Sequence, residues 1–226
     1  MDQQQFDNSW FLFRNNSSSD LRFPLRNDDL IPVLDEDTST HTHKEFVWDY
    51  LLHCAWAARK VSEGSEGWHY DFGSYLYFAY LVSAFTDKFV FCDLRPIDLP
   101  VSNLQMKRED LTKLSFPDNS LRSISCLHVL EHVGLGRYGD EIDPSGDEKA
   151  ASELVRVLAT GGSLLIVLPM NATPRLNFNA HRIYSEEQVA ALFPLRVVES
   201  VYLWGEAMHT NPPESGDYTG CFEFTK

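Results

Sequence analysis

Hydrophobic positions change their spacing repeatedly through the middle of the chain. The stretch WHYDF, which begins at Trp68, predicts a short strand, GSYLYFAYLVSAF predicts a helix, and KFVFCD predicts a strand that ends on Asp93. A weaker strand, LQMKRED, follows after a polar connection. Strands that alternate with helices in this way are typical of a parallel sheet with helices on its faces.

The same alternation continues toward the C-terminus. SLRSISCLHV predicts a strand, and residues 144–160 predict a helix with Ser145 as its N-cap and Gly161 as its stop. GSLLIVLP has the fully apolar character of a buried parallel strand. Ser185 and Gln188 have capping-box spacing at the start of another short helix.

The last 32 residues are expected to add an antiparallel element, because LRVVESVYLW and TGCFEFTK read as two strands that pair with each other. The complete pattern predicts a doubly wound, Rossmann-like α/β fold. We expect a seven-stranded sheet with an antiparallel C-terminal strand pair.

The N-terminal region has a different character. Residues 1–43 are polar, rich in Asn, Ser and Asp, and without a period, which predicts an irregular arm. KEFVWDYLLHCAWAARKV then predicts an amphipathic helix that opens a single α/β domain spanning residues 44–226. On this helix His53, Trp56 and Arg59 either reach a pocket at the strand ends or belong to core packing.

Charge and cysteine usage limit the classes of partner. The net charge is −14 and no basic stripe stands out, which argues against binding to nucleic acid or to a membrane surface. The four cysteines lack metal or disulfide spacing, and the first residues lack the features of a secretory leader. We therefore expect reduced core thiols and a cytoplasmic protein.

Polar residues stand where the predicted parallel strands end, which is where open α/β sheets bind ligands. The first strand ends in Asp71, Gly73 and Ser74, and the second in Asp93. An acid about 20 residues beyond a glycine turn is placed to accept both hydroxyls of a ribose. Asp110 follows the third strand, where it can hydrogen-bond an adenine amino group.

These residues, with Leu130-Glu131-His132 and the stretch ELVRVLATGG, resemble class I S-adenosylmethionine-dependent methyltransferases from about Trp68 to the end of the chain. More narrowly, SCLHVLEHVGLGRYGD and FNAHRIYS resemble a bacterial family known as domain of unknown function 268, whose genes lie among genes of polysaccharide biosynthesis. The resemblance implies O-methylation of a sugar, polysaccharide precursor or other small polar metabolite. It places S-adenosylmethionine against Asp71, Gly73, Ser74, Asp93, Leu94, Asp110, Leu111 and Leu127.

One departure from that superfamily concerns the first glycine turn. Where relatives carry two further glycines, this chain carries Tyr75 and Tyr77. A side chain at the first of these positions would intrude where the methionine part of the cofactor normally passes. Two alternatives to the methyltransferase therefore remain: a catalytically degenerate binding protein, and a metal-dependent enzyme that does not use S-adenosylmethionine.

The segment HVLEH after the fourth strand carries the candidate chemistry. A zinc-protease motif of this spacing requires a helix, whereas His128 ends a predicted strand, so we disfavour a peptidase. One hypothesis is a divalent-metal site of His128, Glu131, His132 and His181 that orients and activates an acceptor hydroxyl. Another is a metal-free acceptor site in which His132 or His181 is the general base beside Glu131. The third is a purely structural role.

The loop GLGRYGDEIDPSGD follows this segment. Arg137, Tyr138 and Asp140 are candidates for holding a small-molecule or glycan acceptor, and Arg182 for binding an anionic group on it. The alternative is a surface loop whose polar groups satisfy one another.

Overall fold

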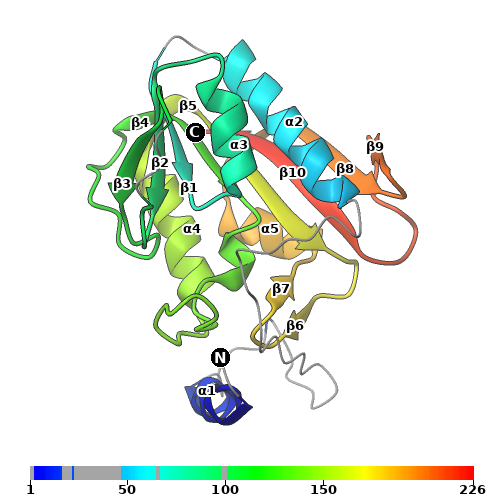
Figure 1. Ribbon diagram of the computed structural model, residues 1–226. Helices are drawn as coiled ribbons and strands as arrows, with labels where there is room; N and C mark the ends of the chain where they lie inside the picture. The colour runs from blue at the N-terminus through cyan, green and yellow to red at the C-terminus, as the bar shows by residue number, and fades with distance from the viewer. Residues whose placement is uncertain (1–2, 17–21, 23–46, 65–66, 98–100) are drawn as a thin grey trace.

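The computed structural model describes residues 3–16, 22, 47–64, 67–97 and 101–226. An eight-stranded sheet in the order β3-β2-β1-β4-β5-β10-β8-β9 forms its centre (Figure 1). The first five strands of that order pair in parallel. Their bounds are β1 His69–Phe72, β2 Phe89–Asp93, β3 Gln105–Arg108, β4 Leu121–Leu127 and β5 Leu158–Met170.

The strand order reverses direction between β1 and β4. From β1 the chain moves outward through β2 to β3, and from β4 it moves the opposite way to β5 and beyond. The connections after β1 and β4 therefore diverge above the carboxyl ends of these two strands, and a crevice between such connections is the usual ligand site of open α/β sheets.

The C-terminal strands add an antiparallel part, as predicted. β10 (Tyr218–Thr225) lies between β5 and β8 (Arg196–Trp204) and pairs antiparallel with both. The sheet has one strand more than the seven expected, because β9 (Ala207–His209) folds back on β8 as a short hairpin at the edge. Its three residues carry too little periodicity to be recognised in the sequence.

Helices cover both faces of the sheet, and β5 shows how one strand serves both. Leu164, Ile166 and Leu168 point to one core cluster, while Leu165 and Val167 point to the other, as the alternation of side chains along a strand requires. Helices α4 (Gly146–Val157) and α5 (Glu186–Leu192) pack on the first face. Helices α2 (Trp48–Glu63) and α3 (Leu76–Ser83) pack on the second (Figure 1).

Two helix ends differ from their prediction. Ser145 stands at the N-cap of α4 but its side chain does not cap the helix, since its N–H and Oγ both donate to Asp143 Oδ1 at 3.0 and 2.8 Å. The helix ends at Val157, before Gly161, which adopts a φ of +72° inside β5. The capping box of α5 is present as predicted, with Ser185 and Gln188 bonded reciprocally.

The N-terminal region is only partly irregular. Residues 3–16 form helix α1 (Gln3–Asn16), which was predicted to belong to an irregular arm. The buried rings of Phe6 and Phe13 pack on Phe178, with ring centroids 5.8 and 4.9 Å apart. Residues 1–2, 17–21 and 23–43 of the predicted arm lie outside the described part of the chain.

A small hairpin that the sequence did not predict lies beyond the end of β5. Its strands are β6 (Arg175–Asn177) and β7 (His181–Ile183). It brings His181 toward the crevice.

All four cysteines are free thiols and buried. Within the described residues, no helix combines the length and apolar character needed to cross a bilayer.

Candidate functional site

The turn after β1 approaches its neighbours closely. Gly73 has a φ of +70°, and its N–H donates to the Cys92 carbonyl at 2.8 Å. A Cβ at this position would lie 3.2 Å from Val129 Cγ1 and 3.8 Å from Asp93 Oδ2. The position therefore favours glycine for both its backbone conformation and its space, and the turn places the Asp93 carboxylate beside an open stretch of backbone.

The predicted adenosine-binding acids lie at adjacent strand ends. Asp93 is half-buried, and its Oδ1 accepts the Arg95 N–H at 2.7 Å. Asp110 is exposed, and its Oδ1 accepts from the N–H and Oγ1 of Thr112 at 2.9 and 2.7 Å. The Asp93 carbonyl accepts the N–H of the residue before Asp110 at 3.0 Å, so the two acids belong to one edge of the crevice. Leu94 and Leu111 are half-buried beside them.

Asp71 and Ser74 have a different position from the one predicted, because they are buried beneath the crevice. Asp71 Oδ2 accepts the Ser74 N–H at 3.1 Å, and its Oδ1 accepts the Ser74 and Ser125 hydroxyls at 2.5 Å each. Ser74 Oγ accepts the Leu127 N–H at 3.0 Å. Burial raises the pKa of Asp71 to about 7 although these hydrogen bonds oppose the shift. The two side chains, and the buried Leu127, hold the β1 turn against β4.

The segment after β4 forms a turn of 3-10 helix, Leu130–His132, and not an α-helix. A zinc-protease arrangement of HVLEH is therefore absent. His128 precedes the turn with a φ of +54°, which is uncommon for a non-glycine residue. Its Nδ1 lies 2.8 Å from Glu131 Oε1. Burial would raise the pKa of Glu131, but the neighbouring His132 and His128 outweigh it and hold the pKa below its usual value.

Two further imidazoles face the same place. His132 Nδ1 lies 2.6 Å from the Ala180 carbonyl; since a carbonyl only accepts, Nδ1 carries the proton and Nε2 is left as an acceptor. Burial lowers the pKa of His132 to about 4. The ring of His181 has its centroid 6.3 Å from that of His132, and burial also lowers its pKa. Both rings are therefore neutral at pH 7.

The four predicted metal ligands are brought together, but not as a metal site. His128 Nδ1 is bonded to Glu131 Oε1, while His132 Nε2 lies 3.8 Å from that oxygen and its Nδ1 is used by a carbonyl. In the described part of the chain, no group of three or more His, Cys, Asp or Glu side chains is arranged to hold a metal ion. The metal-site hypothesis is not supported.

The loop after HVLEH divides into two roles. Arg137 Nη1 donates to the Ala180 carbonyl at 2.9 Å, and Tyr138 lies edge-on to His132 with ring centroids 5.5 Å apart. These two side chains form a wall beside the imidazoles. Asp140 instead organises the loop, since its Oδ2 accepts the N–H of Gly134 at 2.8 Å and its Oδ1 that of Tyr138 at 3.1 Å.

The prediction that Arg182 binds an anionic group of the acceptor is wrong. Its side chain is fully buried and donates to the carbonyls of Val133 and Pro144 at 2.7 and 3.1 Å, with Asp147 as its ion-pair partner at 3.5 Å. Neighbouring side chains on a strand point to opposite sides, so His181 faces the crevice while Arg182 ties the loop to α4.

Helix α2 contributes side chains that the sequence only partly indicated. Tyr50 stacks on His128 with ring centroids 5.2 Å apart, and His53 lies 4.9 Å from the same ring. Trp56 packs in the core and Arg59 is exposed. Tyr50 was recognised only as part of the helical period, because nothing in that spacing distinguishes a core ring from a pocket ring.

The altered glycine positions also meet α2. Tyr75 lies edge-on to Tyr50, with ring centroids 5.5 Å apart, and edge-on to Tyr77 at 4.8 Å. Tyr77 itself is exposed. Tyr75 therefore belongs to an aromatic contact between the β1 turn and α2.

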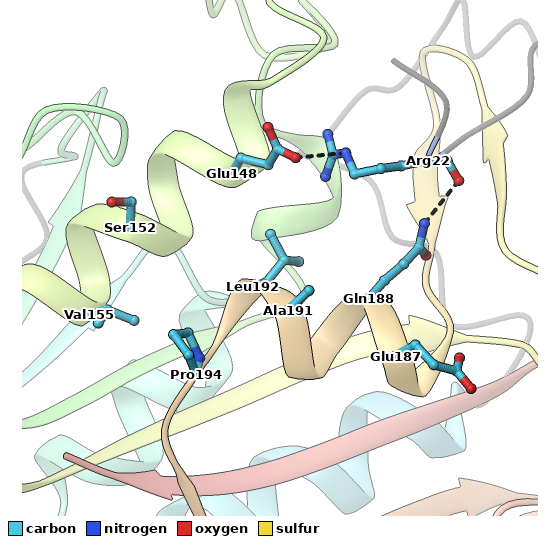
Figure 2. A pocket seen from close by; sticks show the side chains of 9 residues that line it. All are labelled: Arg22, Glu148, Ser152, Val155, Glu187, Gln188, Ala191, Leu192 and Pro194. Carbon is cyan, nitrogen blue, oxygen red and sulfur yellow. Dashed lines mark hydrogen bonds and ion pairs between the residues drawn. The ribbon is translucent and has the colours of Figure 1, made fainter. Parts of the chain in front are cut away.

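A groove of about 530 Å³ lies elsewhere, between α4 and α5 (Figure 2). Arg22 lies at one side of this groove. Its Nε forms an ion pair with Glu148 Oε1 at 2.8 Å, and its backbone carbonyl accepts a hydrogen bond from Gln188 Nε2 at 2.9 Å. None of its lining residues is a candidate site residue. They are Arg22, Glu148, Ser152, Val155, Glu187, Gln188, Ala191, Leu192 and Pro194.

Comparison with protein families gives one relevant match. Residues 108–201, less than half of the chain, match the model of a family described as "Caenorhabditis protein of unknown function, DUF268". The expected family is thus found, but its description names Caenorhabditis and gives no support to a bacterial origin. No match is found among curated proteins.

Solved structures of methyltransferases share the fold. The N-methyltransferase NodS of Bradyrhizobium japonicum WM9, in complex with S-adenosyl-L-homocysteine, is 16% identical with a TM-score of 0.55, over 97% of this chain and 100% of that one. The 1,6-didemethyltoxoflavin-N1-methyltransferase of Burkholderia thailandensis, with 1,6-didemethyltoxoflavin and S-adenosylhomocysteine bound, is 13% identical with a TM-score of 0.54, over 100% and 91%. A putative methyltransferase from Bacillus halodurans C-125 is 13% identical with a TM-score of 0.52, over 76% and 97%. At these identities the likeness shows the fold, a class I methyltransferase-like α/β sheet, and no more.

Proposed function

We propose that the protein is an S-adenosylmethionine-dependent methyltransferase that acts on a small polar acceptor. The observation that carries the proposal is that Gly73, Asp93 and neutral His132 follow or end β1, β2 and β4, three strands that are adjacent in the sheet. The first pair suits a nucleoside, and the imidazole suits proton removal from an acceptor. Two neighbours of the same fold were solved with S-adenosylhomocysteine, which supports the cofactor.

The residues present fit the adenosine half of this cofactor. A nucleoside approaches the backbone closely at Gly73, where a Cβ would meet Val129 and Asp93. The Asp93 carboxylate would accept ribose hydroxyls and Asp110 the adenine amino group. The methionine half of the cofactor would have to pass Tyr75, whose ring lies against that of Tyr50. The methionine half would therefore run along these rings and not along bare backbone.

The cofactor, when bound, supplies an electrophilic methyl group. The task of the protein is to align an acceptor with that group and to take up the proton that the acceptor loses. His132 fits the second task, because its Nδ1–H is fixed on the Ala180 carbonyl and its Nε2 keeps a lone pair. A pKa of about 4 makes His132 a weak base, yet it suffices, because an oxygen or nitrogen that is gaining a methyl group becomes strongly acidic.

Arg137 and Tyr138 would position the acceptor beside this base. Arg137 lies 3.4 Å from His132 Nδ1, and Arg95 from the Asp93 loop lies 5.8 Å from the Tyr138 ring centroid. The loop thus connects the acceptor side with the cofactor side. We infer that it holds the acceptor in line with the cofactor.

Calorimetric titration of S-adenosylhomocysteine into the full-length protein tests this proposal. We expect saturable binding that weakens in Asp93→Asn and persists in His132→Gln, since the latter residue serves the acceptor. Absence of binding to the unmodified chain would mean that Tyr75 closes the crevice, and the methyltransferase proposal would then be wrong.

A further inference from the structure

Unpartnered polar atoms are concentrated at one place in the interior. Among the described residues, five buried side-chain nitrogen or oxygen atoms have no hydrogen-bond partner, and four of them belong to three residues in contact. They are both ring nitrogens of His53, Nε2 of His128 and Oε2 of Glu131. Buried polar atoms are nearly always bonded, and exceptions call for an explanation such as a ligand.

The three side chains form a compact group beneath α2. His53 and His128 have ring centroids 4.9 Å apart, and His128 Nδ1 lies 2.8 Å from Glu131 Oε1. His53 is 0% exposed and Glu131 1%. Tyr50 covers the group, 5.2 Å from the His128 ring and 5.0 Å from that of His53.

The tautomers follow from these contacts. The Glu131 carboxylate accepts from His128 Nδ1–H, so His128 Nε2 is the ring atom that remains open. Burial lowers the pKa of His53 well below its usual value, and His128 acts in the same direction. His53 is therefore neutral, with one N–H donor and one acceptor nitrogen. The carbonyl of Asp49, one turn earlier, raises its pKa slightly without being aligned for a hydrogen bond.

We propose that His53, His128 and Glu131 form a polar subsite for two adjacent hydroxyl groups, so that the acceptor carries a vicinal diol, as a polyol or sugar does. The proposal rests on the proposed function and narrows its acceptor. The subsite presents both donor and acceptor positions, and a hydroxyl both donates and accepts. The four open atoms are spread over two rings and a carboxylate, so two hydroxyl groups can pair with more of them than one can.

Other ligand chemistries match less well. An ammonium group only donates, so it would leave the His53 N–H without a partner. A phosphate or carboxylate only accepts, and the buried Glu131 carboxylate would repel it. A neutral amine needs its one lone pair for the methyl group and cannot also accept from His53.

Access to the subsite requires α2 to move at one end. Its C-terminal half is anchored to the sheet, with Lys60 Nζ 2.6 Å from Glu199 Oε2 and 3.1 Å from Glu223 Oε2. In the half that carries Tyr50, Thr219 Oγ1 donates to Asp49 Oδ2 over a longer distance of 3.4 Å. A ligand would therefore displace the N-terminal half and leave the Lys60 anchor in place.

The test uses NMR of the full-length protein with ¹⁵N-labelled histidine, with and without S-adenosylhomocysteine. The probes are cis-1,2-cyclohexanediol, cyclohexanol and cyclohexylamine, three molecules that differ only in their polar groups. We expect the diol to shift the ring-nitrogen signals of His53 and His128 saturably, with the other two probes binding about tenfold more weakly. His69, which is buried but bonded on both nitrogens, should not respond.

Two variants complete the experiment. His53→Phe should lose about tenfold in diol affinity, whereas His209→Phe, which keeps a ring stacked on Trp204, should retain it. Equal binding of the amine, an unchanged His53→Phe, or no response to the diol would overturn the proposal. If the diol bound but S-adenosylhomocysteine did not, the subsite proposal would hold and the methyltransferase proposal would be wrong. If S-adenosylhomocysteine bound but the diol did not, the methyltransferase proposal would hold and the subsite proposal would be wrong.

Discussion

Replacing His53 by Phe should leave the protein about as stable as before. His53 is fully buried and neither of its ring nitrogens has a hydrogen-bond partner. A buried polar group without a partner costs about 1–3 kcal/mol. Phe removes that cost but is slightly larger, and overpacking against Tyr50 and His128 costs about 1–3 kcal/mol. The two costs oppose each other, so the net expectation is a change in unfolding free energy between about −2 and +2 kcal/mol, centred near zero.

His69→Phe provides a matched control. His69 is 2% exposed, but its Nδ1 and Nε2 lie 2.7 and 2.8 Å from the hydroxyls of Ser123 and Ser125. Phe at this position leaves the buried Ser125 hydroxyl and the half-buried Ser123 hydroxyl with fewer partners, which should destabilise the fold by about 2–4 kcal/mol.

Urea unfolding at pH 7, followed by far-UV circular dichroism, measures both variants on one scale. Equal m-values would show that the same surface is exposed on unfolding. If His53→Phe were destabilised as strongly as His69→Phe, His53 would be bonded in solution, and the reasoning from unpartnered atoms would be refuted.

Two further predictions concern the cofactor acid and the pH dependence. Asp93→Asn should weaken S-adenosylhomocysteine binding roughly 10- to 100-fold by calorimetry, because charged hydrogen bonds contribute about 1.5–3 kcal/mol. Asp118→Asn, on the far side of the fold, should leave the affinity unchanged. Equal losses of affinity in the two variants would contradict the assignment of Asp93 to the ribose. Burial lowers the pKa of His69 to about 3 and that of His132 to about 4, below the unfolded value near 6.5. Because the folded state binds these protons less tightly than the unfolded state, the histidines cause stability to be lost as pH falls below 6.5. The raised pKa of Asp71 acts in the opposite direction between about pH 4 and 7. Two histidines outweigh one carboxylate, so the unfolding free energy should rise between pH 4.5 and 6.5 by roughly 1 kcal/mol per pH unit; a maximum at or below pH 4.5 in urea titrations would count against these assignments.

The parts of the fold that depend on local patterns were predictable. The alternation through β5 and the capping box at Ser185 and Gln188 both appear in the structure. Helix α1 was missed because its polar surface hides a narrow apolar stripe, Phe6 and Phe13, whose partner Phe178 is distant in the chain. Such a helix is stabilised by a tertiary contact, which no local window contains.

The positions of the candidate site residues relative to the strands were predictable, but their contacts were not. Asp93 ends β2 and His132 follows β4, as the sequence pattern indicated. Arg182 was assigned to the acceptor because it follows His181, and only the fold shows that one of the two points into the interior. His53 carried no signal that separates a core residue from a site residue, since burial and missing partners are properties of the folded chain.

A comparison of the buried carboxylates of Asp71 and Glu131 explains why we assign acceptor binding to the turn after β4 and not to the end of β1. Asp71 is surrounded by three hydrogen bonds from Ser74 and Ser125, and burial still raises its pKa to about 7. Its oxygens are used within the protein, so it has nothing left to offer a ligand. Glu131 is equally buried, but the adjacent His132 and His128 keep its pKa low, and its Oε2 has no partner. An ionised buried carboxylate with an open oxygen is costly unless something binds there, and a bound hydroxyl that donates to it would offset that cost. Under the proposed function, Asp71 therefore holds the β1 turn in place, and the group around Glu131 contacts the acceptor.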